Sequence, residues 1–166
     1  MYTIISGTNR VRSNTIRVAE QYQQLLGDKG VSATLVSLEN LDVSERNAAI
    51  RQLEEDILIP SHKFIFISPE YNGSIPGVLK SLIDNSDIQR VWWGKKALLT
   101  GISSGRAGNI RGMEHLTGIL HYVKVVVHPN KLPISVINKL LDSTGYIIDK
   151  DTLGAINVQL DEFISF

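Results

Sequence analysis

The chain has 166 residues, of which 43% are hydrophobic, so it is long enough to form one domain with a full core. It contains 17 basic and 17 acidic residues; this balance excludes the basic surface of a dedicated nucleic-acid-binding protein and argues against an acidic electron carrier. Cysteine is absent, which excludes disulfides, thiolate nucleophiles and cysteine metal sites.

The location of the protein is predicted from what the sequence lacks. No apolar run reaches the roughly 18 residues of a membrane span, and a strand-like segment begins at Tyr2 without a signal-peptide pattern. We therefore expect residues 1–166 to form a single cytoplasmic domain.

The predicted elements alternate between strands and helices. The strands are short apolar runs, and the helices have apolar residues three and four positions apart. The first half contains a strand at 2–6, a loop at 7–14, a helix to about 29 ended by Gly30, a strand at 31–38, a helix at 44–59 and a strand at 63–67. The second half contains a helix at 76–85, a strand at 96–102, a glycine-rich loop at 103–112, a helix at 113–123, a strand at 124–127 and an amphipathic helix around 153–164.

This order predicts an α/β three-layer sandwich, in which helices cover both faces of a five-stranded parallel sheet. The first, third and fourth strands are almost uniformly apolar, as is typical of buried parallel strands. For five strands, the flavodoxin-like order 2-1-3-4-5 is the natural choice, with the ligand crevice outside the carboxyl ends of the strands. Three loops meet there: loop one (residues 6–15), loop three (68–77) and loop four (103–112).

Loop one precedes a helix, whose free backbone N–H groups and dipole attract anions. Its side chains suit a phosphate group: Thr8, Ser13, Asn14 and Thr15, together with Arg10 or Arg12. The alternative is a solvated loop in which Ser13 only caps the helix. The glycine patterns of nucleoside triphosphatases and of dinucleotide-binding folds are missing. A phosphomonoester therefore fits this loop better than a nucleoside triphosphate or a dinucleotide.

Loop three follows the apolar strand at 63–67 and leads into a helix that begins at Pro76 and Gly77. Its backbone and the Asn72 amide can bind the edge of a planar heterocycle, with Tyr71 packed beside the ring. The alternative is a plain turn, since Pro69, Gly73, Pro76 and Gly77 are all ordinary turn or helix-start residues.

Loop four has glycines at 105, 108 and 112, which let the backbone approach a ligand closely. Arg106 and Arg111 can bind a phosphate or carboxylate group. The alternative is a flexible connection without a binding role.

The remaining polar and aromatic features predict structure rather than chemistry. The four histidines lack metal-ligand spacing, and no serine-nucleophile motif is present. We expect Trp92 and Trp93 to cover apolar surface, where a subunit contact can form. The acidic run 54–56 predicts a solvated helix face.

The three loops together resemble the NADPH-dependent FMN reductases of flavodoxin-like fold, which include bacterial quinone, azo and chromate reductases. The resemblance extends from Met1 to about Val127. The family's first-loop motif is occupied by Gly7, Thr8, Arg10 and Ser13, with threonine in place of serine. Its central motif is matched throughout by Pro69, Glu70, Tyr71, Asn72, Pro76, Gly77, Leu79 and Lys80, and the fourth loop is matched by Ser104 and Gly105. The chain departs from the family at Asn85, where tryptophan is common, and at Arg106.

The resemblance implies FMN as cofactor, NADPH or NADH as cosubstrate and a small-molecule electron acceptor. The FMN phosphate is expected on loop one, and the isoalloxazine ring against Pro69 to Gly73, with Ser104, Gly105 and Arg106 on another side. No catalytic side chain is required, because the flavin performs hydride transfer. Family members are commonly dimers or tetramers, so a homo-oligomer is expected. The alternatives are a flavodoxin-like electron carrier and a non-enzymatic FMN-binding protein.

Overall fold

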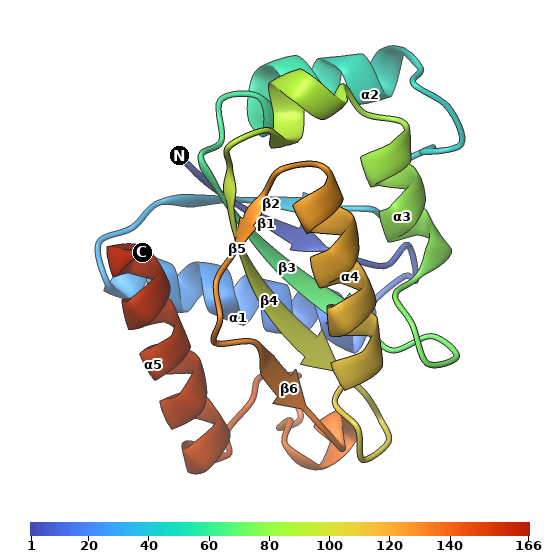
Figure 1. Ribbon diagram of the computed structural model, residues 1–166. Coiled ribbons are helices and arrows are strands. Elements are labelled where there is room, and N and C mark those ends of the chain that lie inside the picture. Colours follow the sequence, from blue (N-terminus) through green and yellow to red (C-terminus); the bar gives the residue numbers. More distant parts are fainter.

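The computed structural model covers residues 1–166 and has a parallel sheet between two helical layers (Figure 1). The strands are β1 (Tyr2–Ser6), β2 (Ala33–Ser37), β3 (Lys63–Pro69), β4 (Lys96–Ile102), β5 (Val126–Val127) and β6 (Leu132–Ile134). The main helices are α1 (Asn14–Asp28), α2 (Ala48–Leu53), α3 (Gly77–Asp84), α4 (Ile110–Tyr122) and α5 (Lys150–Ser165). Short π-helical segments cover Glu54–Leu58 and Ile88–Trp92, and a 3-10 turn covers Ile137–Lys139.

The strand order is β2-β1-β3-β4-β5, which confirms the predicted flavodoxin-like topology. A sixth strand, β6, was not predicted; it pairs in parallel with the end of β4, where Thr100 lies opposite Leu132. Its three residues give no periodic signal, and only the packing on β4 makes them a strand. The predicted strand at 124–127 shortens to β5, because Lys124 has a φ of 60° and lies in the turn that follows α4.

The two faces of the sheet are buried in separate clusters, because successive residues of a strand point to opposite sides. Ile5, Phe64 and Phe66 face α3 and α4, whereas Ile4 and Ile65 face α1 and α5. The near-continuous apolar strands of the sequence follow from this burial on both sides.

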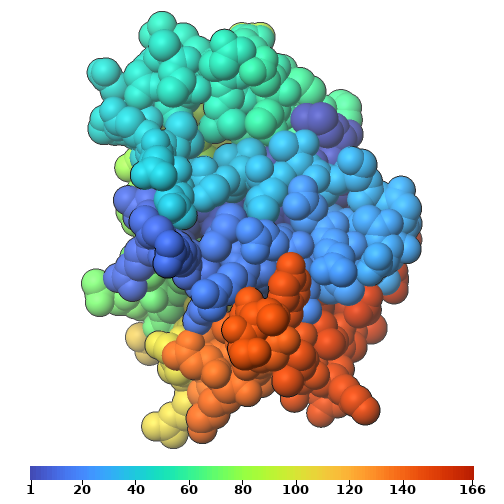
Figure 2. All heavy atoms as spheres, turned by 180° about the vertical axis from the view of Figure 1, so that it is seen from behind, coloured from blue at the N-terminus to red at the C-terminus, as the bar shows by residue number.

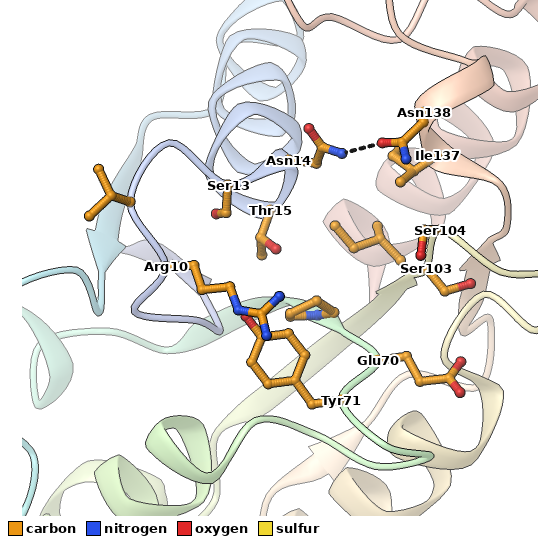
Figure 3. A pocket seen from close by; sticks show the side chains of 13 residues that line it. Arg10, Ser13, Asn14, Thr15, Glu70, Tyr71, Ser103, Ser104, Ile137 and Asn138 are labelled. Atoms are coloured by element: carbon orange, nitrogen blue, oxygen red, sulfur yellow. Dashed lines mark hydrogen bonds between the residues drawn. The ribbon is translucent and has the colours of Figure 1, made fainter.

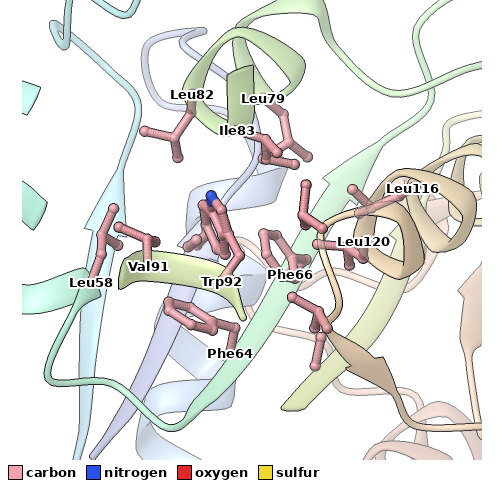
Figure 4. Close-up of a cluster of buried hydrophobic side chains, with 14 of the residues drawn as sticks. Leu58, Phe64, Phe66, Leu79, Leu82, Ile83, Val91, Trp92, Leu116 and Leu120 are labelled. Atoms are coloured by element: carbon pink, nitrogen blue, oxygen red, sulfur yellow. The ribbon is translucent and has the colours of Figure 1, made fainter. Parts of the chain in front are cut away.

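Trp92 is a core residue and not a surface cover, so that prediction was wrong. Its ring is fully buried and packs 5.0 Å from the ring of Phe64, and its N–H donates to Ser86 Oγ at 2.8 Å (Figure 4). The neighbouring Trp93 remains 40% exposed, beneath the ammonium group of Lys124. One tryptophan of the pair therefore fills the α3–α4 side of the core, and the other lies at the surface.

The prediction of a solvated helix face at 54–56 was wrong for Glu54, because this residue is completely buried. Its carboxylate accepts two hydrogen bonds from Arg46 Nε at 3.1 Å, one from Arg46 Nη2 at 2.7 Å and one from the N–H of Asp87 at 2.7 Å. The next residue, Glu55, is exposed as predicted and pairs with Arg90. Glu54 therefore joins three chain segments near the amino ends of the strands.

The chain between β6 and α5 packs along α1 and reaches the carboxyl end of the sheet. The Gln21 side chain exchanges hydrogen bonds of 2.9 Å with both the C=O and the N–H of Ile147. Seen from behind, the orange segment before α5 lies directly against the blue α1 (Figure 2). The predicted final helix is confirmed as α5. No helix has both the length and the apolar character that crossing a membrane requires.

Candidate functional site

A cavity of about 300 Å³ opens where loops one, three and four meet at the carboxyl ends of β1, β3 and β4 (Figure 3). Its walls are formed by Arg10, Val11, Ser13, Asn14, Thr15, Pro69, Glu70, Tyr71, Ile102, Ser103, Ser104, Ile137 and Asn138. A smaller polar hollow of about 210 Å³ adjoins it through Glu70, Ser103 and Ser104. We call this smaller space the outer hollow. Its remaining lining residues are Asn72, Gly73, Gly105, Arg106 and Ala107.

The start of α1 forms one end of the cavity. Ser13 is the N-cap and its Oγ accepts from the N–H of Ile16 at 3.2 Å, so the capping alternative describes its geometry correctly. Its hydroxyl hydrogen remains free to donate. The backbone N–H groups of Asn14 and Thr15 make no hydrogen bond within the chain. This end therefore presents several donors and a positive helix dipole to the cavity.

The Asn14 side chain makes a hydrogen bond within the chain, whereas its backbone N–H does not. Its Nδ2 donates to Asn138 Oδ1 at 2.8 Å, which ties the first turn of α1 to the 3-10 turn after β6 (Figure 3). Asn138 and Ile137 are cavity residues that sequence reasoning missed, because the chain beyond Val127 shows no motif. Val136 has a φ of 46°, an unusual value for a branched residue, but this conformation leaves no trace in the sequence.

Arg10 and Tyr71 form the opposite wall. The guanidinium carbon lies 4.2 Å from the centre of the tyrosine ring, and the tyrosine hydroxyl is 2.6 Å from Thr8 Oγ1. Thr8 is buried behind Tyr71 and does not line the cavity. Arg12, the other candidate of loop one, is exposed and also lies outside the cavity lining.

Loop three contains a tight turn at Asn72 and Gly73, whose φ angles are 52° and 78°. The N–H of Tyr71 donates to Ser74 O at 2.9 Å, and the reverse bond measures 3.1 Å. Two successive positive φ angles explain the Asn-Gly pair through turn geometry alone. The exposed Asn72 side chain lines the outer hollow and not the main cavity.

Loop four is hydrogen-bonded to neighbouring segments at several points. Ser103 N–H donates to Ile134 O at 3.0 Å, and Ser103 Oγ accepts from the N–H of Gly108 at 2.9 Å. Asn109, buried at the start of α4, donates to Ser68 O at 2.9 Å and so links loop four to loop three. Arg106 lines the outer hollow, whereas Arg111 is exposed on α4 and lines neither space.

The segment behind Ile137 and Asn138 depends on one carboxylate and should therefore loosen in acid. Asp142 accepts hydrogen bonds from the N–H groups of Thr144, Gly145 and Tyr146 and from the Thr144 hydroxyl. These hydrogen bonds hold the pKa of Asp142 below its ordinary value, and the bond from the Thr144 hydroxyl has the largest effect. Because the folded pKa is depressed, the stabilisation is present above the unfolded pKa of about 3.9 and is lost as pH falls through the folded value.

Amide exchange measures this effect. After correction for intrinsic rates, protection of residues 142–147 should fall below about pH 4. Asp142→Asn should lower protection at neutral pH and flatten the acid response. Equal protection of this segment at acidic and neutral pH in the unmodified protein would contradict the expectation.

The family follows from comparison with known proteins. Residues 2–138 match the family model described as NADPH-dependent FMN reductase. The chain belongs to this family. It is 31% identical over 138 residues to a quinone reductase of Escherichia coli K12, which covers 79% of the chain and 73% of that protein. It is 33% identical over 117 residues to an NAD(P)H-dependent FMN reductase of Pseudomonas aeruginosa, with 68% and 62% covered.

A 2-hydroxy-1,4-benzoquinone reductase of a Burkholderia species is 30% identical over 106 residues, covering 61% of the chain. The matched region spans 58% of that relative's length, and 62% of the Pseudomonas enzyme. The family match confirms the predicted family, and the relatives are named as an NAD(P)H-dependent FMN reductase and as quinone reductases. The predicted pairing of FMN with NAD(P)H is likewise that of the family.

Solved structures confirm the fold. The NAD(P)H:acceptor oxidoreductase FerB of Paracoccus denitrificans superposes with a TM-score of 0.79 at 22% identity, covering 99% of this chain and 94% of that one. The apo form of an NADH:FMN oxidoreductase gives 0.77 at 21% identity, with 99% and 89% covered. An archaeal flavodoxin gives 0.66 at 14% identity, with 99% and 98% covered.

Proposed function

We propose that this FMN reductase family member binds FMN in the cavity between loops one, three and four. It would transfer hydride from NAD(P)H through FMN to a small acceptor: a quinone, an azo compound, a metal oxyanion or free flavin. The observation that carries the proposal is the set of unpaired donors at the start of α1, which faces Arg10 across one cavity. We further propose that residues 1–166 act as one domain, in the cytoplasm.

The donor set fits a phosphate group. The N–H groups of Asn14 and Thr15, the Ser13 hydroxyl and the Arg10 guanidinium would hold it, because anions bind best where helix N-terminal donors and a charged fork converge. The isoalloxazine would lie toward Pro69 and Glu70.

The outer hollow would then border the ring. Its lining by Asn72, Gly73, Ser104, Gly105 and Arg106 provides polar groups for the edge of a heterocycle or for a second substrate. When bound, FMN supplies the hydride and electron chemistry. The residues of this chain bind and orient the two substrates, which explains why the cavity needs no nucleophilic side chain.

Ser13→Ala tests the phosphate position. Loss of the hydroxyl should weaken FMN binding roughly tenfold, the effect of one hydrogen bond to a charged group, and should leave riboflavin binding unchanged. The substitution also removes a helix cap, so Asn47→Ala, which removes the equivalent cap of α2 far from the cavity, is the matched control. Equal FMN affinity in Ser13→Ala and the parent protein would show that the phosphate is misplaced.

Two alternatives make different predictions. A flavodoxin-like carrier would bind FMN, but NADPH would not bleach the bound flavin without a partner reductase. A non-enzymatic FMN-binding protein would show no NADPH oxidation above background with quinones, azo dyes, ferric complexes or free flavin. Bleaching by NADPH alone, together with turnover of one of these acceptors, would favour the reductase over both.

We also propose that the protein forms a homodimer, or a homotetramer built from two such dimers, through the groove between α3 and α4. The groove has a volume of about 520 Å³ and an apolar floor that includes Ile83 and Ile119. Tyr122 projects from its edge and is 86% exposed, while Gly118, one turn earlier, leaves open space. A projecting ring and a matching gap on one face suit packing of two copies about a two-fold axis.

The rim of the groove has both charge signs, through Lys80 and Asp84, so two copies can meet there without net repulsion. A standard interface removes about 800 Å² from each partner. That is about a tenth of the 7901 Å² surface of this chain.

Tyr122→Glu should convert the oligomer into a form of half its size, because a carboxylate would be buried in the apolar groove of the second copy. The matched control is Val158→Glu on α5, which places the same charge at a residue that is 54% exposed. Light scattering with size-exclusion chromatography measures the masses. A monomeric parent protein, or a Tyr122→Glu variant of unchanged mass, would contradict this interface.

A further inference from the structure

We infer that Tyr71 serves the phosphate end of the proposed FMN site, as the support that holds Arg10 in position. This inference rests on the proposed function, and it assigns Tyr71 a different role from packing beside the flavin ring. Tyr71 is thereby a positioning residue that acts through Arg10.

Arg10 has no other partner that would fix its guanidinium group. It takes part in none of the ion pairs of the structure, although Glu70 lines the same cavity. Its guanidinium group stacks on the Tyr71 ring, with 4.2 Å between the guanidinium carbon and the ring centre. The charge is therefore oriented by an aromatic face and remains free to pair with an anion.

Tyr71 is itself held at both ends, which makes it a suitable support. Its hydroxyl is 2.6 Å from Thr8 Oγ1, and its backbone N–H and C=O both bond to Ser74. Thr8 is buried and is fixed in turn by the bond from its N–H to Ser6 O at 2.9 Å. Loop one thus positions the ring from behind while Arg10 covers it in front.

The Arg10 guanidinium group covers one face of the Tyr71 ring. In Figure 3 the Arg10 side chain lies across the Tyr71 ring, between that ring and the start of α1 with Ser13 and Thr15. A ligand entering the cavity meets the guanidinium group there. The effect of Tyr71 on binding should therefore depend on the phosphate of the ligand and on the presence of Arg10.

A double-mutant cycle with two ligands tests the inference. Dissociation constants of FMN and riboflavin are measured by flavin fluorescence for the parent protein, Tyr71→Leu, Arg10→Ala and the double variant. We expect Tyr71→Leu to weaken FMN binding roughly three- to tenfold and riboflavin binding by less than about twofold. In the Arg10→Ala background, Tyr71→Leu should have no further effect on FMN.

A conservative variant keeps the test valid if Tyr71→Leu fails to fold. Tyr71→Phe retains the stack and removes only the hydroxyl contact with Thr8 Oγ1, so it should keep most of the FMN affinity. Equal losses for FMN and riboflavin in Tyr71→Leu, or additive losses in the double variant, would overturn the inference in favour of a ring contact.

The outcomes also separate the inference from the proposed function. A parent protein that binds no flavin contradicts the proposed function itself. A parent protein that binds FMN no more tightly than riboflavin contradicts the phosphate role of Arg10, and with it the role assigned to Tyr71.

Discussion

Gly101→Ala should lower the free energy of unfolding by about 3 kcal/mol. It should also weaken FMN binding by roughly tenfold or more. A methyl group at this position on β4 would overlap the carbonyl oxygen of Gly108 and lie 3.0 Å from Cβ of Asn109. Loop four would have to move away from the sheet, and the hydrogen bond from Asn109 to Ser68 would be stretched. Denaturant unfolding and flavin fluorescence measure the two effects.

Gly105→Ala is the matched control within the same loop. A methyl group there meets no atom within 4 Å, and the residue does not have a positive φ. Its free energy of unfolding should stay close to that of the parent protein. If Gly101→Ala behaved like Gly105→Ala, the close packing of loop four on β4 could not be what shapes the cavity.

Glu54→Gln should lower the free energy of unfolding by about 2–4 kcal/mol. The carboxylate is fully buried and binds both Arg46 and the N–H of Asp87, so neutralising it leaves Arg46 with only its longer contact of 3.4 Å to the Asp87 carboxylate. The range is reduced from that of a fully buried pair because the Arg46 side chain is 40% exposed and water screens its charge. Urea denaturation monitored by tryptophan fluorescence measures the change, since Trp92 lies in the adjoining core.

The neighbouring acid provides the comparison for this prediction. Glu55 pairs with Arg90 at the surface, with both side chains about half exposed, so Glu55→Gln should cost less than about 1 kcal/mol. FMN affinity should be unchanged in both variants, because Glu54 lies outside the cavity lining. Similar costs for the two substitutions would mean that burial of Glu54 does not matter.

The topology was predictable because it depends on local patterns that repeat. Uniformly apolar strands alternate with amphipathic helices, and only a buried parallel sheet accommodates both. β6 and the buried Glu54 were not predictable for the opposite reason. A three-residue strand has no period, and an acidic side chain gives no sign that an arginine eight residues earlier, Arg46, will bind it.

Much of the candidate site was predictable because helix starts and strand ends can be located in a sequence. Loops one, three and four meet because parallel strands all end at one edge of the sheet. The cavity wall formed by Ile137 and Asn138 was not predictable, since their position depends on a fold-back of the chain over α1 that has no motif. The contact of Arg10 with Tyr71 likewise joins residues 61 positions apart, and each is ordinary alone.

We propose above all that this chain binds FMN and passes electrons from NAD(P)H through it. The most direct measurement is an anaerobic titration of the FMN-loaded protein with NADPH, followed by the visible absorbance of the flavin. We expect the absorbance to be bleached without a partner reductase and to return when a quinone is added. A protein that takes up no FMN, or one whose bound flavin stays oxidised in excess NADPH and NADH, would contradict it.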